Sequence, residues 1–117
     1  MNRLDGKVAL ISGAARGIGA ETARLMAEAG AWVAIGDVLD ERGRETARAI
    51  EGAGGEAMYT RLDVTREEDW TAAIAAVTDR FGGLDILVNN AGVFLASDDS
   101  GFMTGAGLVV DGGITAQ

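Results

Sequence analysis

The feature that most constrains the fold is a short apolar run leading into a glycine-rich loop, VALISGAARGIG at residues 8–19. Residues 8–11 are too few for a helix and are apolar throughout, which predicts a strand buried on both faces. Gly13 permits a sharp turn, while Gly17 and Gly19 let the following helix lie close to the strand and let a ligand approach the backbone. The first N–H groups of that helix have no partner inside it, so the loop predicts a pyrophosphate site.

A second apolar run, residues 32–35, ends at Gly36 and Asp37. An acidic residue some way after such a loop is typical of dinucleotide-binding units, where it binds a ribose. The alternative is a tight strand-to-helix turn that binds no ligand. Because strand, loop, helix and acid follow one another in this order, the sequence favours the dinucleotide site.

The composition excludes several classes of partner and of chemistry. The chain has 117 residues, 48% of them hydrophobic, and a net charge of −8, which argues against nucleic acid and anionic membranes as partners. It has no cysteine and no histidine, so we predict no disulfide, no thiol catalysis and no metal site. The first residues are no signal peptide, and no apolar run could span a bilayer. We expect one globular, cytoplasmic domain over residues 1–117.

Residues 1–92 alternate between short apolar segments and amphipathic segments. The predicted strands are residues 8–11, 32–35, 58–62 and 86–88, and the predicted helices are residues 17–29, residues 40–51 and a third that follows Thr65 and ends before Gly82. With right-handed crossovers, this order predicts an α/β fold: a three-layer, Rossmann-like, doubly wound parallel sheet with strand order 3-2-1-4. Ligands bind such sheets where the order reverses, which here brings residues 13–19 and 89–92 together.

The pattern also predicts finer features of the helices. The first helix is expected to turn one apolar face inward, made of Ile18, Thr22, Leu25, Met26 and Ala29. Asp40 is expected to cap the second helix. Thr65 and Glu68 have the form of a capping box at the start of the third. Trp70 and Phe81 have helical spacing and are expected in the core.

The remaining residues comprise a connection, residues 93–105, and a C-terminal segment, residues 106–117. Residues 108–110 are apolar and predict a fifth strand. We expect this strand to pair beside residues 86–88 in a five-stranded parallel sheet. The alternative is a swapped dimer in which it completes the sheet of a second copy. In both arrangements an apolar sheet edge favours a homodimer or a higher homo-oligomer.

Several motifs together resemble the short-chain dehydrogenase/reductase family. The similar residues are Ser12-Gly13-x-x-x-Gly17-Ile18-Gly19, Asp37, Asp63-Val64, Asn89-Asn90-Ala91-Gly92, Met103-Thr104-Gly105 and Val109-Val110-Asp111-Gly112-Gly113. The family usually has threonine where Ser12 stands. The resemblance covers nearly the whole chain except about residues 93–99. It implies a Rossmann-type NAD(P)-binding domain and hydride transfer between NAD(P) and an alcohol or carbonyl carbon.

The resemblance also implies which residues hold the cofactor. It assigns the pyrophosphate and adenosine side to Gly13, Arg16, Gly17, Ile18 and Gly19, the adenine to Asp63 and Val64, and the ribose side to Asn90, Ala91 and Gly92. Asp37 is expected to accept hydrogen bonds from the adenine ribose and to repel a 2′-phosphate, so NAD is favoured over NADP. Arg16 argues the other way, because a basic residue in this loop can hold a 2′-phosphate. The alternative interpretations are a surface arginine for Arg16 and a post-strand turn for Asp63.

The sequence departs from the family pattern in its middle. Family members continue after the asparagine motif through segments that carry a catalytic asparagine, a serine and a Tyr-x-x-x-Lys pair, whereas here the C-terminal strand follows soon after residue 92. The single tyrosine, Tyr59, lies on the third predicted strand, at a sheet edge, and the single lysine, Lys7, precedes the first. They cannot form the pair, and the chain has no histidine or cysteine to replace it. We therefore assign no catalytic residue.

Three functions remain open on this evidence. The first is a shortened family member that binds NAD weakly, because the contacts to the nicotinamide are missing, and has little or no dehydrogenase activity. The second is an oxidoreductase completed by a partner chain or by an internal segment that this sequence lacks. The third is a structural or assembly protein without a ligand. The glycine loop and Asp37 favour the first two, and the missing pair favours the first over the second.

Overall fold

A computed structural model describes residues 3–90, in which strands and helices alternate along the chain. The elements are β1 (Val8–Ser12), α1 (Gly17–Glu28), β2 (Trp32–Asp37), α2 (Asp40–Gly52), β3 (Glu56–Arg61), α3 (Glu67–Phe81) and β4 (Ile86–Val88). The predicted connection at residues 93–105 and the predicted strand at residues 108–110 lie outside the described residues. Within residues 3–90, no helix is long and apolar enough to cross a membrane.

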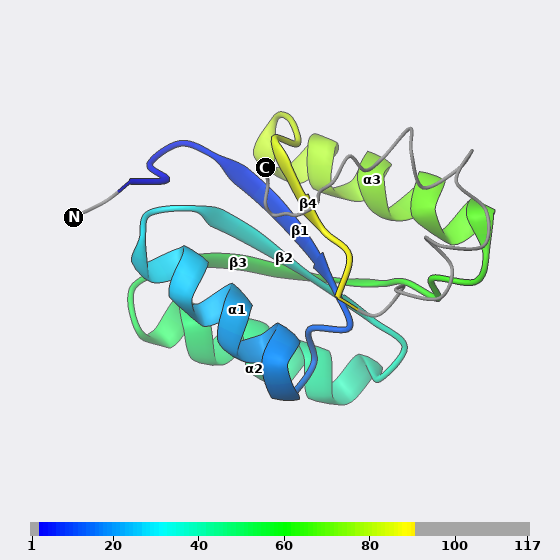
Figure 1. Ribbon diagram of the computed structural model, residues 1–117, viewed down its shortest axis with the longest axis horizontal. Coiled ribbons are helices and arrows are strands. Elements are labelled where there is room, and N and C mark those ends of the chain that lie inside the picture. The colour runs from blue at the N-terminus through cyan, green and yellow to red at the C-terminus, as the bar shows by residue number, and fades with distance from the viewer. Residues whose placement is uncertain (1–2, 91–117) are drawn as a thin grey trace.

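The described strands form one parallel sheet in the order β3-β2-β1-β4 (Figure 1). This confirms the predicted Rossmann-like α/β fold and its strand order. The register pairs Ser12 with Gly36 and Ile11 with Val88. The carboxyl ends of β2, β1 and β4 therefore lie side by side at one edge of the sheet, where the predicted site begins.

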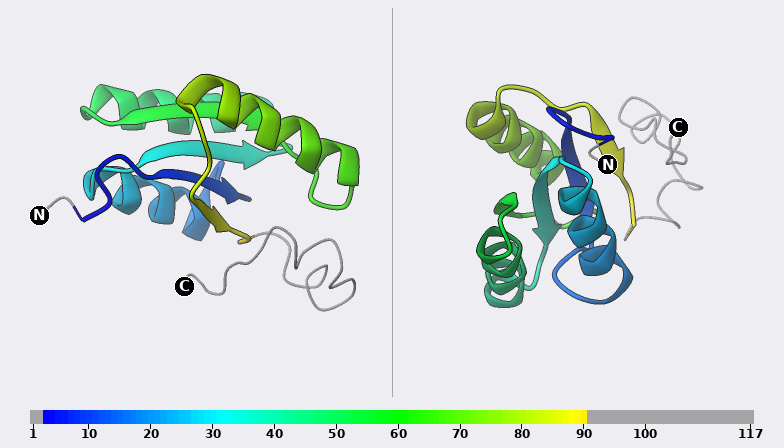
Figure 2. Two further views of the ribbon diagram at one scale, coloured as in Figure 1. Left: turned by 90° about the horizontal axis from the view of Figure 1, so that it is seen from above. Right: turned by 90° about the vertical axis from the view of Figure 1, so that its left-hand side faces the viewer.

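Alternate residues of the strands face two separate layers of helices. Ala9 and Ile11 of β1 belong to the cluster that α1 and α2 cover, whereas Val8 and Leu10 belong to the cluster that α3 covers. Figure 2 shows the same arrangement from two further directions, with α3 across the sheet from α1. Every residue of β1 is buried, as the apolar run predicted for a strand covered on both faces.

The predicted inner face of α1 is wrong at Ile18 and Leu25, whereas Met26 packs partly buried against the cluster under α1 and α2, as predicted. Ile18 is 78% exposed and Leu25 is 51% exposed, whereas Gly19 and Ala23 are buried against the sheet. The helix begins at a loop that brings its backbone close to β1, so its smallest residues face inward. An amphipathicity pattern weights large apolar residues, and here two of them, Ile18 and Leu25, lie on the outer stripe.

Both predicted side-chain caps are also wrong. Neither α2 nor α3 has a side-chain hydrogen bond at its N-cap, and these N-caps are Leu39 and Arg66. The side chain of Asp40 instead accepts hydrogen bonds from β3. The hydroxyl of Thr65 donates to Asp63 at 2.6 Å. The sequence pattern predicted that both side chains cap a helix. Asp40 instead binds a neighbouring strand, and Thr65 instead binds within the turn that precedes the helix.

The expected core of the α3 layer is confirmed. Trp70 and Val77 are fully buried, and Phe81 packs partly buried against the same cluster. The indole N–H of Trp70 donates to the carbonyl of Val64 at 3.0 Å. Trp32, predicted to lie in a buried strand, is 40% exposed and stacks at a tilt on Phe81, with 5.4 Å between ring centroids.

Candidate functional site

The glycine-rich loop follows β1 at the edge where the strand order reverses. Gly13 and Gly17 have φ angles of 66° and 65°, which side chains disfavour. A Cβ on Gly19 would lie 2.3 Å from the Gly13 carbonyl oxygen and 2.9 Å from Nδ2 of Asn90. The close approach of α1 to the loop therefore requires glycine at position 19, as the sequence predicted.

The loop has a fixed inner side and an open outer side. Ala14 and Ala15 are fully buried, and the Ala14 N–H donates to the Gly36 carbonyl at 3.2 Å. Arg16 and Gly17 are exposed, and a Cβ built on Gly17 meets no atom within 4 Å. The first N–H groups of α1 thus start beside open space, which is the geometry that a pyrophosphate needs.

The end of β4 is joined to the start of the loop. The Ser12 hydroxyl lies 3.1 Å from Oδ1 of Asn89, and the Asn90 side chain donates to the Gly13 carbonyl at 3.3 Å. These contacts bring Asn90 to the glycine loop, as predicted. Ala91 and Gly92, the other residues assigned to the ribose side, lie outside the described residues.

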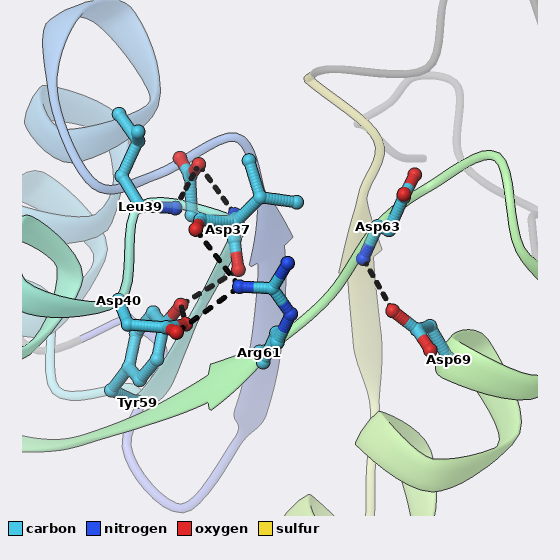
Figure 3. Close-up of polar contacts among 8 residues, drawn as sticks. Asp37, Leu39, Asp40, Tyr59, Arg61, Asp63 and Asp69 are labelled. Atoms are coloured by element: carbon cyan, nitrogen blue, oxygen red, sulfur yellow. Dashed lines mark hydrogen bonds and ion pairs between the residues drawn. The ribbon is translucent and has the colours of Figure 1, made fainter.

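Asp37, the last residue of β2, lies directly beside the loop. Its Oδ2 accepts a hydrogen bond from the Ala15 N–H at 2.9 Å, and its Oδ1 accepts from the N–H groups of Val38 and Leu39 at 2.7 and 3.1 Å. Figure 3 shows this carboxylate above the turn that leads into α2. A carboxylate offers about four acceptor positions, so capacity remains for a ribose hydroxyl.

Two side chains of β3 hold the turn after Asp37. The Tyr59 hydroxyl lies 2.7 Å from the Asp37 carbonyl oxygen and 2.5 Å from Oδ1 of Asp40, and these two acceptors share its single proton. Arg61 donates to the Val38 carbonyl and to Oδ2 of Asp40, each at 3.0 Å. In Figure 3 both side chains point from the strand toward this turn. They fix the backbone from which the Asp37 carboxylate projects.

These contacts shift the pKa values of the groups involved. Burial and the hydrogen bond to Asp40 raise the pKa of Tyr59 above its ordinary value. The same hydrogen bond, helped by Arg61, lowers the pKa of Asp40. Tyr59 therefore stays protonated as a hydrogen-bond donor. At neutral pH a tyrosine in this setting is ionised less often than a free one, so it is less available as a general base.

Tyr59 and Lys7 lie in different parts of the fold, as the sequence predicted. Tyr59 pairs with Ile35 in the edge strand β3, while Lys7 comes just before β1. Strand β2 separates the two. Neither residue is available to the other as a catalytic partner.

Asp63 and Val64 follow β3 and make a turn. The Asp63 carboxylate accepts from the N–H and the hydroxyl of Thr65 at 3.0 and 2.6 Å, and these bonds lower the pKa of Asp63. Its own N–H donates to Asp69 at 2.9 Å, the contact on the other side of Figure 3. Val64 packs partly buried in the α3 cluster. These bonds are those of the post-strand turn, the alternative interpretation of Asp63.

A separate groove of about 720 Å³ lies between α1 and α2. Gly17 and Thr46 line it together with Arg24, which forms ion pairs with Glu21 and Glu28. Asp37 and Asn90 do not line this groove. Of the predicted site residues that the structure describes, Gly17 alone lines this groove, so the groove adjoins the loop only there.

Sequence reasoning missed three residues around the site. Thr46 donates to the Ala15 carbonyl at 2.6 Å, and Tyr59 and Arg61 support the turn after β2. All three come from elements distant in the sequence, so no local motif marks them. The parallel pairing of β2 with β3 does place Tyr59 and Arg61 level with Ile35 and Asp37, and this register was the one available signal.

The fold and the loop together are those of Rossmann-type dinucleotide-binding domains. The family model described as short chain dehydrogenase matches residues 7–105. This chain therefore belongs to the short-chain dehydrogenase family, as the motifs indicated.

Relatives with named activities share about half of the aligned residues. Trans-4-hydroxycyclohexanecarboxylate dehydrogenase of Sinomonas cyclohexanicum is 52% identical over 99 residues, which cover 80% of this chain and 38% of that protein. The 3-alpha-(or 20-beta)-hydroxysteroid dehydrogenase of Mycobacterium tuberculosis is 52% identical over 91 residues, which cover 78% of this chain and 34% of that protein. The chain thus spans little more than a third of the length of these relatives.

A solved structure has the same arrangement of elements. The crystal structure of hydroxysteroid dehydrogenase from Escherichia coli is 42% identical, with a TM-score of 0.75 over 77% of this chain and 38% of that one. The likeness supports the strand order and the position of the loop.

Proposed function

We propose that this chain binds NAD by its adenosine half at the edge formed by the glycine loop and Asp37. The observation that carries this proposal is the hydrogen bond between the Asp37 carboxylate and the Ala15 N–H at 2.9 Å. It joins the group suited to a ribose to the loop suited to a pyrophosphate. Gly13, Arg16, Gly17, Ile18 and Gly19 are proposed to surround the pyrophosphate.

The remaining assignments complete the proposed site. Asn90 reaches the loop, which supports a role on the ribose side together with Ala91 and Gly92. Asp63 and Val64 are proposed to flank the adenine. The Asp63 side chain accepts hydrogen bonds from Thr65 in the described residues. Asp63 is therefore proposed to contribute to the adenine site by shaping the turn after β3.

We further propose that NAD binds better than NADP. A 2′-phosphate on the adenine ribose would lie beside the Asp37 carboxylate, and two neighbouring negative charges repel each other. The exposed Arg16 acts in the opposite direction. The carboxylate dominates because the backbone N–H groups of Ala15, Val38 and Leu39 hold it in place, whereas the Arg16 side chain extends into solvent.

Bound NAD supplies a hydride acceptor for alcohol oxidation, and this chain by itself is proposed to catalyse that step poorly or not at all. Its one tyrosine holds the β2–α2 turn, and its one lysine comes just before β1, which β2 separates from the strand of the tyrosine. A second candidate function is dehydrogenase activity completed by a further segment or chain, because the relatives are longer than the part this chain matches.

Calorimetric titration with NAD and NADP tests the binding proposal. We expect saturable NAD binding in the micromolar to millimolar range, and a loss of about tenfold or more in Asp37→Asn, since a hydrogen bond to a charged group contributes about 1.5–3 kcal/mol. Asp37→Asn should also reduce the preference for NAD over NADP. Asp79→Asn, at an exposed position on α3, removes the same charge far from the loop and should bind as the wild type does. Equal affinity in both variants, or no saturation by NAD, contradicts the proposal.

An absorbance assay for NADH separates the two candidate functions. The alcohols to test include hydroxysteroids and hydroxycyclohexanecarboxylates, the compounds named for the relatives. We expect no turnover above background for this chain alone. Turnover at ordinary enzyme rates would reject the proposed loss of activity and favour the second candidate.

We also propose that the chain associates with itself through a sheet edge and its C-terminal strand. Among the described strands β4 pairs only with β1, so one edge of β4 has no described strand beside it. Exposed strand edges favour pairing between chains. Measurement of the molecular mass in solution tests this, and a monomer at high concentration contradicts it.

A further inference from the structure

We propose that Thr46 is a positioning residue for the dinucleotide loop, through a bond that fixes the peptide between Ala15 and Arg16. This inference rests on the proposed NAD site. Thr46 lies in α2, and its hydroxyl donates to the Ala15 carbonyl across 31 positions of sequence, at 2.6 Å. Ala15 is thus held at both polar atoms, because its N–H is bound by Asp37.

The hydroxyl of Thr46 differs from those of two other helical threonines. Thr22 in α1 donates to the Ile18 carbonyl at 2.8 Å, and Thr71 in α3 donates to the Glu67 carbonyl at 3.3 Å. Both of these bonds reach back four residues within their own helix, which is the usual local arrangement. Thr46 instead donates its one hydroxyl proton to the Ala15 carbonyl in the glycine-rich loop, so the contact is tertiary.

The orientation of one peptide gives this contact its effect. In a planar trans peptide, the carbonyl of one residue and the N–H of the next point in opposite directions, and the described residues contain no cis peptide. Holding the Ala15 carbonyl toward α2 therefore directs the Arg16 N–H away from α2. Arg16 is the N-cap of α1, where the chain passes from the buried part of the loop to its exposed part.

Burial makes the bond hard to replace by water. Ala15 is fully buried and Thr46 is half-buried. A buried carbonyl without a hydrogen-bond donor is unfavourable. Removal of the Thr46 hydroxyl therefore favours other loop conformations, in which the Ala15 carbonyl has a different partner. Asp37, Ala15 and Thr46 then form one chain of contacts from the ribose acceptor, through the loop, to α2.

Loss of the tether lowers affinity by reducing the fraction of molecules whose loop is ready to bind. Apparent affinity falls in proportion to that fraction, so a loop that is competent about one tenth of the time binds about tenfold more weakly. ADP-ribose is the suitable probe, because it carries the pyrophosphate and the adenine ribose without the nicotinamide. We expect about tenfold weaker ADP-ribose binding in Thr46→Val.

Three variants keep the test specific. Thr46→Val removes the donor with little change of shape, and Thr46→Ser restores the donor and should restore binding. Thr71→Val removes a helical hydroxyl of the other kind and should bind as the wild type does. The thermal midpoint of each variant shows whether a loss of binding merely follows a loss of stability.

Amide hydrogen exchange at Ala15 in the unliganded chain supplies a second measurement that needs no ligand. We expect Thr46→Val to accelerate this exchange about tenfold, since local opening governs exchange, with Thr46→Ser and Thr71→Val unchanged. Unchanged exchange in Thr46→Val overturns the inference whatever the ligand does. Faster exchange with undiminished ADP-ribose affinity overturns it as well. If the wild type itself does not bind ADP-ribose, the proposed function fails, and this inference fails with it.

Discussion

The two faces of the sheet are packed by different means. Six of the ten buried residues described in the cluster under α1 and α2 are alanine, whereas the cluster under α3 is built around Trp70, Leu10 and Leu62. On the first face, added Cβ atoms at Gly19 and Gly43 would meet neighbours at 2.3 and 2.2 Å. One face is thus close-packed through small residues, and the other is filled by large ones.

This difference follows from what each face has to do. Backbone N–H groups can reach a ligand only if the loop and the start of α1 lie close to the strands, and small residues allow that approach. The α3 face carries no such loop, so large side chains can fill it and bury more apolar area. We expect the face with the loop to be sensitive to added atoms and the other face to be sensitive to lost ones.

The largest expected effect is on the face filled by large residues. Trp70→Ala should lower the free energy of unfolding by about 3–5 kcal/mol, because it removes a fully buried indole and leaves a cavity. Chemical denaturation measures this loss. Trp32→Ala, at a 40% exposed position, serves as the control and should lose much less. Similar losses for the two tryptophans would contradict the assignment of Trp70 to the core.

An added methyl group at Gly19 should have the next largest effect. Gly19→Ala should lower the free energy of unfolding by about 1–3 kcal/mol, as overpacking does, and should also abolish NAD binding by displacing the loop. Gly52→Ala is the matched control, because a Cβ there meets no atom within 4 Å. Denaturation and NAD titration of both variants make the comparison. Unimpaired NAD binding by Gly19→Ala would show that close approach is not required.

A smaller effect is expected at high pH, on the face under α1 and α2. The pKa of Tyr59 is raised in the fold, so the unfolded chain loses this proton first, at about pH 10. The stability that Tyr59 provides is therefore present below pH 10 and declines as the pH rises above it. Tyr59 is the one tyrosine of the chain, so tyrosinate absorbance reports it directly. Ionisation at the ordinary value in the folded chain would contradict the contacts to Asp37 and Asp40.

The smallest effect is expected at low pH, on the other side of the site. Thr65 lowers the pKa of Asp63, so this contribution is present above about pH 3.9 and is lost as the pH falls below it. Thr65→Val should weaken the acid dependence of unfolding slightly, because Asp63 is solvent-accessible and its interactions are screened. Denaturation curves at a series of acidic pH values measure the change. An unchanged pH dependence would show that Thr65 does not hold Asp63.

The parts of the fold set by repeated patterns were predictable from the sequence. Apolar runs of strand length, separated by amphipathic helices, led to the 3-2-1-4 order, and the glycines at 13, 17 and 19 located the loop. The core positions of Trp70 and Phe81 followed from helical spacing. These features depend on the secondary-structure preferences of many residues added together. Preferences of neighbouring segments agree with one another, so the pattern is reliable.

What could not be predicted depends on single tertiary contacts. The Asp40 side chain binds Tyr59 and Arg61 instead of capping a helix, and the inward stripe of α1 is set by the approach to Gly13 rather than by Ile18 and Leu25. Thr46 reaches Ala15 across the fold. Each outcome is a competition between a local preference and a partner whose position is known only once the sheet has formed.

The most direct test of the account is the pattern of amide chemical-shift changes when ADP-ribose is added to the isotope-labelled chain. We expect saturable changes centred on residues 13–19 and on Asp37, with the amides of α3 unaffected. Saturable changes centred on α3 or on the groove between α1 and α2, or no changes at all at high ligand concentration, would contradict it.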